Sequence, residues 1–384
     1  MKIALVSPYD FGYHGGVVTH ISQLSEQLQR LGHVVKILAP LDSSSDLRQE
    51  NLIPIGRPVP VPAGGSIARI SLSIWRERRV RALLKEENFD VLHVHEPLAP
   101  ILPLSVINSS ETANVGTFHA FHGSGYMYFF SKGLMKRWFE RLDSLIAVSE
   151  PAKDYVSKAF PGDYNIIPNG IDVEFFSKNV DPFDAFKDGK LNILFVGRME
   201  KRKGLKYLLQ AYGRLKWEHP DIRLIVVGPG NPGKDVYRIM SERNLRDVVF
   251  VGQVTDAQKR RYFQTADIFC APNTGKESFG IVLCEAMASG KAIVASNIPG
   301  FDSVVTNEKE GLLVPPKDDE AIYLALKQLV ESPSRRSAMG GRGLTSVKAY
   351  SWNKLMPKIV NCYKQAISHH SLRLAKSEAV IHQR

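Results

Sequence analysis

Cysteine is scarce in this sequence, with only Cys270, Cys284 and Cys362 among 384 residues. Their spacing matches neither a metal-ligand pair nor a redox motif, which excludes disulfide scaffolds, zinc fingers and thiol oxidoreductases. Long apolar runs are also missing, which excludes a membrane-spanning helix, and the first residues show no signal-peptide pattern. Together these absences predict a protein of a reducing compartment, the cytoplasm.

Acidic residues are scarcer than basic residues in this sequence. Asp and Glu number 39 against 50 Lys and Arg, which gives a net charge of +11. The two signs nearly balance up to Lys190, and the basic excess lies beyond it. Such an excess attracts nucleic acid, anionic lipid or a polyphosphate ligand. Because the basic half has no RNA-binding aromatic signature, zinc-finger spacing or basic zipper, nucleic acid is not the expected partner.

The order of apolar segments predicts two doubly wound α/β domains in tandem. Apolar strand-like runs alternate with stretches of helical periodicity, which favours parallel sheets covered by helices on both faces. The pattern starts at Ile3 and restarts at Leu191, after a charged stretch, 172–190, that we expect to be a linker. We therefore predict domains over 1–171 and 190–352. The other predicted strands are 34–39, 91–94, 115–118, 145–148, 165–167, 222–227, 248–251, 268–271 and 292–295.

Two loops at predicted strand ends suit phosphate groups. Ligands of such sheets bind at the carboxyl ends of the strands. Gly15 and Gly16 follow the first strand, where glycine lets backbone N–H groups approach a phosphate, although a tight turn would also explain them. The loop 197–204 suits a diphosphate, or is a solvated charged loop. Its four cations are Arg198, Lys201, Arg202 and Lys203.

The most informative stretch carries two carboxylates, Glu277 and Glu285. Glu285 is expected two turns into an otherwise apolar helix, where an ionised carboxylate is costly unless it is paired or bound to a ligand. It is therefore a candidate ligand-binding residue, or the partner of a buried arginine or hydroxyl. The backbone amides of 279–281 open the same helix and suit a phosphate.

Histidines stand at two predicted strand ends in the first domain. His119 follows the strand 115–118 and is expected at the ligand edge, although a lone histidine is more often structural. His93 and His95 share one strand face beside Glu96, and these residue types ligate metals. Because no third ligand is evident, we predict no metal site.

The motifs occur in the order typical of retaining glycosyltransferases of the family 4 type, and the whole chain resembles that family. The resemblance implies the GT-B fold, with the active site in a cleft between two Rossmann-like domains and a crossover helix at about 353–370. Five features carry it: Gly15-Gly16, Pro168–Asp172 at the domain junction, Arg198 with Lys203, Glu277 with Glu285, and Tyr350–Trp352 before the crossover.

The resemblance implies a role for each motif. Arg198 and Lys203 would hold the diphosphate of a nucleotide-sugar donor in place of a metal, and no cofactor is implied. Glu285 would bind the ribose hydroxyls, and His119 would orient the sugar. The implied catalytic residues are His119, Glu277, Arg198 and Lys203. The implied donor-binding residues are Gly15, Gly16, Arg198, Lys203, Glu277, Ser278, Phe279, Gly280, Ile281 and Glu285.

Within this family the chain most resembles the phosphatidylinositol mannosyltransferases. That implies transfer of mannose from GDP-mannose to phosphatidylinositol, with Tyr9 and Arg69 placed to contact the inositol phosphate. The sequence departs from the pattern at Leu98, where an amide is typical, and at 120–124, where small polar residues and a lysine are typical. A different lipid, a polysaccharide or a soluble acceptor, with a UDP-sugar as donor, is the alternative.

A basic stretch over 66–85 favours attachment to the inner face of the cell membrane. Its cations alternate with aliphatic residues and Trp75, which predicts an amphipathic helix on an anionic surface. An ordinary surface helix with a solvated charged side is the alternative. The arginines that we expect to touch the membrane are Arg76, Arg78, Arg79 and Arg81.

Two further classes stay open at this point. A non-hydrolysing sugar-nucleotide epimerase shares the architecture, but it should lack the pairing of Glu277 and Glu285 with the cationic loop. A nucleic-acid-binding protein would account only for the charge.

Overall fold

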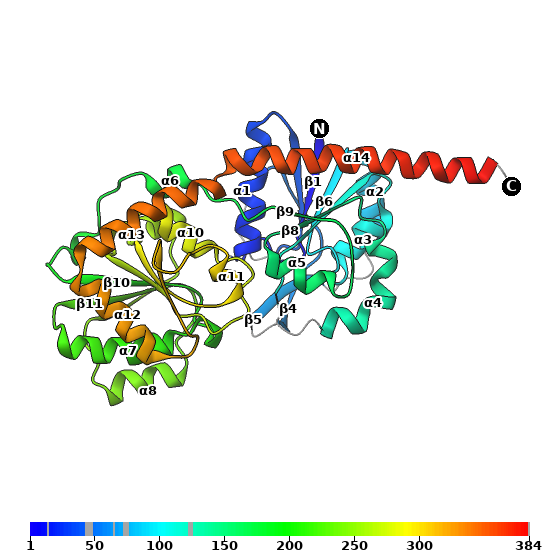
Figure 1. Ribbon diagram of the computed structural model, residues 1–384. Helices are drawn as coiled ribbons and strands as arrows, with labels where there is room; N and C mark the ends of the chain where they lie inside the picture. The colour runs from blue at the N-terminus through cyan, green and yellow to red at the C-terminus, as the bar shows by residue number, and fades with distance from the viewer. Residues whose placement is uncertain (14, 43–48, 64–65, 72–76, 122–125, 383–384) are drawn as a thin grey trace. The chain divides into compact units, whose positions relative to one another are not determined.

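The computed structural model describes the whole chain except residues 14, 43–48, 64–65, 72–76, 122–125 and 383–384. It consists of two compact units, one formed by Met1–Gly170 with Trp352–Arg384 and the other by Ile171–Ser351. Each unit has a parallel sheet with helices on both faces (Figure 1), so the predicted α/β class is confirmed. In the described part of the chain, no helix is both long enough and apolar enough to cross a bilayer.

The sheet of the first unit has seven strands in the order β3-β2-β1-β6-β7-β8-β9. All neighbouring pairs are parallel. The strands are β1 Lys2–Val6, β2 Val34–Ala39, β3 Leu52–Pro54, β6 Val91–His95, β7 Ala113–Phe118, β8 Ser144–Ala147 and β9 Tyr164–Ile166. The predicted strands are confirmed to within two residues at either end, and β3 was not predicted because it is so short.

The faces of this sheet are set by alternation along β1. Ile3 and Leu5 pack against one set of helices, α1 and α14, while Ala4 and Val6 pack against the other, α2 and α3. Because both faces of the strand are buried, its sequence is a continuous apolar run rather than an alternating one. The helices of the unit are α1 Gly16–Arg30, α2 Glu77–Glu87, α3 Leu102–Ser109, α4 Tyr126–Phe139, α5 Glu150–Ser157 and α14 Trp352–His382. Helix α14 is longer than the 353–370 expected for the crossover.

A β-hairpin stands where part of a basic helix was predicted. Strand β4 (Pro58–Ala63) pairs antiparallel with β5 (Ser66–Ser71). Pro58, Pro60 and Pro62 alternate in β4, so the missing N–H groups all fall on one edge of the strand and the other edge can pair. Pairing to β4 holds 66–71 extended. The prediction of a helix over 66–71 is therefore wrong, while the described part of the stretch from Glu77 onward is helical, as α2.

The sheet of the second unit has six parallel strands in the order β12-β11-β10-β13-β14-β15. They are β10 Leu191–Val196, β11 Ile222–Val227, β12 Val248–Gly252, β13 Ile268–Ala271, β14 Ala292–Ser296 and β15 Gly311–Val314. The helices are α6 Val173–Ser177, α7 Leu205–Glu218, α8 Lys234–Glu242, α9 Asp256–Thr265, α10 Ile281–Ala288, α11 Pro299–Asp302, α12 Asp319–Glu331 and α13 Pro333–Ser346. The core on one face joins β10 and β11 to α7 and α12.

The stretch expected as a linker, 172–190, packs on the second unit instead. Phe176 of α6 is 2% exposed and lies edge-to-face on Phe263. Phe183 packs on the ring of Tyr262 at a centroid distance of 4.4 Å. The prediction missed this because phenylalanines scattered among charges show no helical or strand period, although Phe176, Phe183 and Phe186 each find an aromatic partner on α9.

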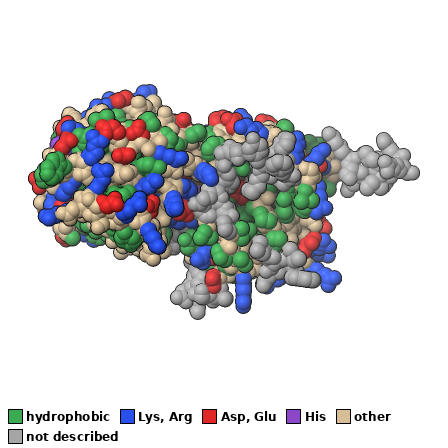
Figure 2. All heavy atoms as spheres, turned by 90° about the horizontal axis from the view of Figure 1, so that it is seen from below, with side chains coloured by type: hydrophobic (Ala, Val, Ile, Leu, Met, Phe, Trp, Pro, Cys, Tyr) green, Lys and Arg blue, Asp and Glu red, His purple; other side chains and the backbone are tan. Residues whose placement is uncertain are grey.

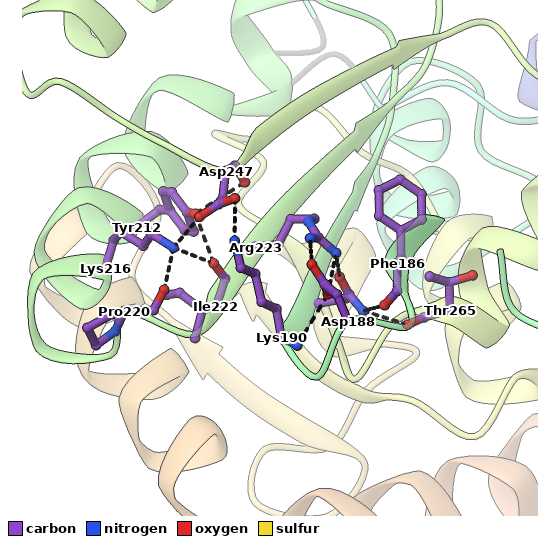
Figure 3. Close-up of polar contacts among 11 residues, drawn as sticks. Phe186, Asp188, Lys190, Tyr212, Lys216, Pro220, Ile222, Arg223, Asp247 and Thr265 are labelled. Atoms are coloured by element: carbon purple, nitrogen blue, oxygen red, sulfur yellow. Dashed lines mark hydrogen bonds and ion pairs between the residues drawn. The ribbon is translucent and has the colours of Figure 1, made fainter. Parts of the chain in front are cut away.

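Ion pairs hold the amino ends of the strands in the second unit (Figure 3). The Asp247 carboxylate, just before β12, accepts from Lys190 Nζ at 2.7 Å and from Lys216 Nζ at 2.6 Å. Arg223 of β11 pairs with Asp188. These contacts lie at the edge opposite the carboxyl ends, where ligands bind in such sheets, so they serve the stability of the fold.

Candidate functional site

The cationic loop after β10 is held against the end of β13. Gly204 has φ of +73°, a left-handed conformation, and a Cβ there would lie 1.8 Å from the Pro272 carbonyl oxygen. A side chain at this position would therefore push the loop off the neighbouring strand end. This close approach brings Lys203 beside Asn273 and Glu277, which follow β13 in the chain.

Glu277 is the centre of a hydrogen-bonded cluster. Its Oε1 accepts from Lys203 Nζ at 2.6 Å, from Asn273 Nδ2 at 2.8 Å and from Arg202 Nη1. Glu200 joins the cluster by pairing with Arg202 at 2.8 Å and with Arg198 at 3.2 Å. The structure thus unites the predicted residues Arg198, Lys203 and Glu277.

The charges in this cluster set one another's protonation. Burial alone would raise the pKa of the Glu277 carboxyl, but Lys203 and Arg202 outweigh burial and hold that pKa below its usual value. Burial lowers the pKa of Lys203, and the carboxylate opposes this. Three cations against two carboxylates leave a net positive charge at the carboxyl ends of β10 and β13, which suits an anionic ligand.

Glu285 lies on α10, is 5% exposed and is paired with a lysine. Lys259 Nζ of α9 contacts its Oε1 at 2.7 Å and also contacts Asp256 at 3.0 Å. Burial raises the pKa of Glu285 although the lysine opposes it. From the sequence, Glu285 was either a ligand-binding residue or the partner of a buried arginine or hydroxyl. In the structure its partner is a lysine, Lys259, which the sequence analysis did not identify.

At the start of α10, the groups that a ligand can reach are mainly backbone N–H groups rather than side chains. Gly280 precedes the helix with φ of +77° and packs over the ring of Phe301. The Phe279 side chain is 3% exposed and packs edge-to-face on Tyr350. Phe279 can therefore reach a ligand only through its backbone, as can Gly280, while Ser278 and Ile281 are half-buried. The peptide N–H groups at this end of the helix suit a phosphate.

Gly15 and Gly16 form the start of α1 in the first unit. Neither has a positive φ, and a Cβ on either would meet no atom within 4 Å. The fold itself therefore does not require glycine at these two positions. Their effect is to leave open space beside the first N–H groups of a 15-residue helix.

His119 ends β7 among other buried histidines. Its Nε2 lies 2.9 Å from His95 Nδ1, and its backbone N–H donates to Glu96 Oε1 at 2.5 Å. The neighbouring His20 of α1 lies 5.3 Å from His119 between ring centroids. His93, in contrast, is bonded to Tyr363 and Thr117. The sequence missed His20, whose only signal was a histidine in the buried stripe of α1.

The two residues expected to contact the acceptor lie side by side. Tyr9 forms a β-bridge with Ile70, and Asp10 N–H donates to the Arg69 carbonyl oxygen at 2.8 Å. The Arg69 guanidinium stacks over the ring of Tyr13 at 4.5 Å and lies 3.9 Å from Asp10. Arg69 is thereby held at the first strand end by the hairpin.

The predicted membrane helix has its apolar side in the core. Val80 and Leu84 of α2 are buried against the sheet, so they are not available for insertion into a bilayer. Arg78, Arg79 and Arg81 lie on the exposed side. Arg76 and Trp75 lie outside the described residues. The amphipathic pattern here is that of a surface helix, with a basic outer side.

Basic and acidic side chains are interspersed on the face of the second unit that Figure 2 shows. The basic excess beyond Lys190 therefore does not form one continuous stripe on that face, as a duplex-binding surface would.

Comparison with known proteins gives two family matches. Residues 14–175 match the family described as Glycosyltransferase Family 4, and residues 177–344 match Glycosyl transferases group 1. The chain is 37% identical to a phosphatidyl-myo-inositol mannosyltransferase of Mycobacterium tuberculosis, over 95% of this chain and 97% of the relative. The enzyme of the same name from Mycolicibacterium smegmatis is 36% identical, over 95% and 94%.

Solved structures show the same fold. Sucrose-phosphate synthase from Thermosynechococcus elongatus superposes with a TM-score of 0.77 at 22% identity, covering 96% of this chain and 99% of that one. HepE of Anabaena, in complex with UDP and glucose, has a TM-score of 0.74 at 19% identity, covering 94% and 98%.

Proposed function

The chain belongs to glycosyltransferase family 4, with the GT-B fold, and from this premise we propose that it transfers mannose from GDP-mannose to phosphatidylinositol with retention of the anomeric configuration. Support comes from relatives named phosphatidyl-myo-inositol mannosyltransferase, which match this chain at 36–37% identity over nearly their whole length. The observation in this chain that carries the proposal is the net positive cluster of Arg198, Arg202 and Lys203 around Glu277.

The cluster suits the leaving group of such a transfer. When the bond between sugar and diphosphate breaks, negative charge develops on the diphosphate, and fixed cations in a partly buried site stabilise it. Arg198 and Lys203 would supply that charge, so transfer would need no metal. The N–H groups at the start of α10, with those beside Gly15 and Gly16, would hold phosphate oxygens.

Carboxylates and His119 would position the sugar and ribose. Glu277, already fixed by three hydrogen bonds, would accept from sugar hydroxyls without having to reorganise. Glu285 would accept from the ribose hydroxyls in exchange for part of its contact with Lys259. His119, neutral because burial lowers its pKa, can donate or accept at the sugar.

The acceptor side would be built on Arg69. Its guanidinium, oriented by Tyr13 and Asp10, would bind the inositol phosphate, with Tyr9 beside it. The enzyme would then work as a peripheral protein at the inner face of the cell membrane. Leu98 and 120–124, which depart from the typical pattern, favour a second candidate, a mannosyl or glucosyl transfer to a different acceptor.

A donor and acceptor screen tests this function. Purified protein would be incubated with GDP-mannose, UDP-glucose or UDP-N-acetylglucosamine and with liposomes that contain or lack phosphatidylinositol. We expect an α-linked mannolipid, identified by NMR, only with GDP-mannose and phosphatidylinositol, and in the presence of EDTA. Transfer to other acceptors alone would establish the second candidate. A β-linked product, or activity that EDTA abolishes, would contradict the mechanism.

A further inference from the structure

Three buried histidines from three elements of the first unit meet beside the end of β7. They are His20 of α1, His95 of β6 and His119, whose side chains are 4%, 0% and 6% exposed. Their ring centroids lie 5.2–5.6 Å apart in all three pairings. One nitrogen from each ring can be chosen so that the three lie within 4.8 Å of one another.

The hydrogen bonding of this cluster is incomplete. His95 Nδ1 and His119 Nε2 bond to each other, but His95 Nε2 and His20 Nδ1 are buried and have no hydrogen-bond partner among the residues that the structure describes. A buried polar atom without a partner is unfavourable and is uncommon in native proteins. Two such atoms in one cluster of imidazoles indicate that the site is built for something besides packing.

We propose that His20, His95 and His119 bind a divalent ion of the zinc type, through one ring nitrogen each, and that the bound ion inhibits sugar transfer by occupying His119. Ligand bonds of 2.0–2.1 Å place three tetrahedral nitrogens about 3.3 Å apart, so modest ring rotations, with loss of the His95–His119 hydrogen bond, complete the site. The fourth position is left for water. The inhibitory part rests on the proposed function, in which His119 orients the sugar.

The surroundings fit this role. Burial keeps the pKa values of all three histidines low, so the rings are neutral, as metal ligation requires. The Asn169 side chain is the neighbour that opposes the lowering of the His119 pKa, and in the metal-bound state it would serve as the outer partner that ligating histidines usually have. Glu96, bonded to the His119 backbone, places a carboxylate beside the site. Imidazole ligands favour zinc, copper or nickel over magnesium and calcium.

His93 provides a matched control. It stacks on His95 at a centroid distance of 4.3 Å and is as buried as its neighbours. Its two nitrogens, however, are already bonded to Tyr363 at 2.8 Å and Thr117 at 2.6 Å. His93→Gln therefore removes a buried imidazole without removing a proposed ligand, whereas His20→Gln removes one.

Binding is measured by calorimetry on untagged full-length protein, with Zn²⁺ and with Mg²⁺. We expect one Zn²⁺ per chain, no competition from Mg²⁺, and at least about tenfold weaker binding in His20→Gln, since even outer partners contribute about 10–100-fold. His93→Gln should bind nearly as the unaltered chain does. Absence of saturable Zn²⁺ binding, or binding that only His93→Gln weakens, would overturn the site.

A spectroscopic measurement keeps the test independent of how the variants fold. Co²⁺ added to the unaltered protein should give the intense visible bands of four-coordinate cobalt, displaced by Zn²⁺. The weak bands of six-coordinate cobalt would overturn the proposed geometry.

The inhibitory part is tested by transfer assays at increasing Zn²⁺, each variant compared with its own metal-free rate. We expect inhibition at the concentration that saturates the site, and a shift to higher Zn²⁺ in His20→Gln. Saturation without inhibition overturns the role of the ion but not the site. If no donor supports any transfer, the proposed function fails while the binding measurement still decides the site.

Discussion

Lys203 is held by Glu277 in the structure and, in the proposed function, by the donor diphosphate. Arg198→Ala and Lys203→Ala should each lower kcat about 100- to 1,000-fold, the cost of removing one fixed donor from a developing anion. Lys201 is exposed in the same loop and is not among the described residues that bond to Glu277, so Lys201→Ala should change kcat little. Initial rates of product formation measure kcat in each variant, and circular dichroism checks that the variants are folded. Turnover close to that of the unaltered enzyme in Lys203→Ala would remove the loop from the site.

Glu285 has a structural partner as well as a proposed ligand, and the two roles can be separated. Glu285→Gln leaves Lys259 with Asp256 alone, so the free energy of unfolding should fall by about 3 kcal/mol, near the lower end for breaking a buried pair. Adding Lys259→Gln should recover part of that loss, because the uncompensated charge is removed.

Affinity for GDP separates the two roles further. If Glu285 binds ribose, calorimetry should show weakened GDP binding in both the single and the double variant, whatever the stability. Recovery of GDP affinity in the double variant would mean that Glu285 acts only as the partner of Lys259.

The sequence predicts candidate residues for the site, but it does not predict their partners in the structure. Glu277 was singled out by its spacing from Glu285, which resembles the family signature. Its bond to Arg202, however, joins residues 75 positions apart. Such a contact depends on which strand lies next to which, and β10 is neighboured by β13 only through the crossover order of the sheet.

At the scale of elements, strands buried on both faces were predictable, whereas the short edge strands β3 and β15 and the hairpin of β4 and β5 were not predicted. β13 is a continuous apolar run and β11 is one apart from Arg223, and their predicted bounds agree with the structure. Strand β5 was mistaken for part of a helix because Arg69 and the aliphatic residues of β5 fit either period. Its conformation is decided by pairing to the prolines of β4, which no periodicity within β5 can show.

The ion pairs at the amino ends of β10–β12 should affect stability and leave activity unchanged. Hydrogen bonds from Lys190 and Lys216 lower the pKa of Asp247 to about 2. Because this is below the value of about 3.9 expected in the unfolded chain, the stabilisation is complete above that value and is lost as the pH falls towards 2. Asp247→Asn should cost about 1–2 kcal/mol at pH 7, a modest figure because the side chain is 27% exposed.

Denaturant unfolding between pH 2 and pH 7 measures this contribution. The difference between the unaltered chain and Asp247→Asn should shrink as the pH falls. Asp221→Asn, at an exposed acid nearby, should change the free energy of unfolding by less than about 0.5 kcal/mol. A loss of stability that is the same at every pH would contradict the assignment to the carboxylate charge.

At the scale of the whole molecule, the charge pattern predicts a class of partner, an anionic lipid surface, but not the mode of attachment. The sequence of 66–85 favoured a helix that inserts aliphatics into a bilayer. In the structure, Val80 and Leu84 belong to the core of the first unit, while Arg78, Arg79 and Arg81 of α2 face outward. Binding through this surface would therefore be electrostatic and reversible, without shallow insertion by these aliphatics.

This distinction has a direct test. Each cation near an anionic surface contributes about 1 kcal/mol, so replacing Arg78, Arg79 and Arg81 with serine should weaken binding to anionic liposomes by roughly 100-fold. A control with the same loss of charge replaces Arg238, Arg243 and Arg246, which are exposed on the second unit, and should bind nearly as well as the unaltered chain. Co-sedimentation at low and high salt measures both, and high salt should release the unaltered protein because the attraction is screened within about 8–10 Å at physiological ionic strength. Attachment that survives both high salt and the triple replacement would mean that apolar insertion, through a part of the chain other than Val80 and Leu84, holds the protein to the bilayer.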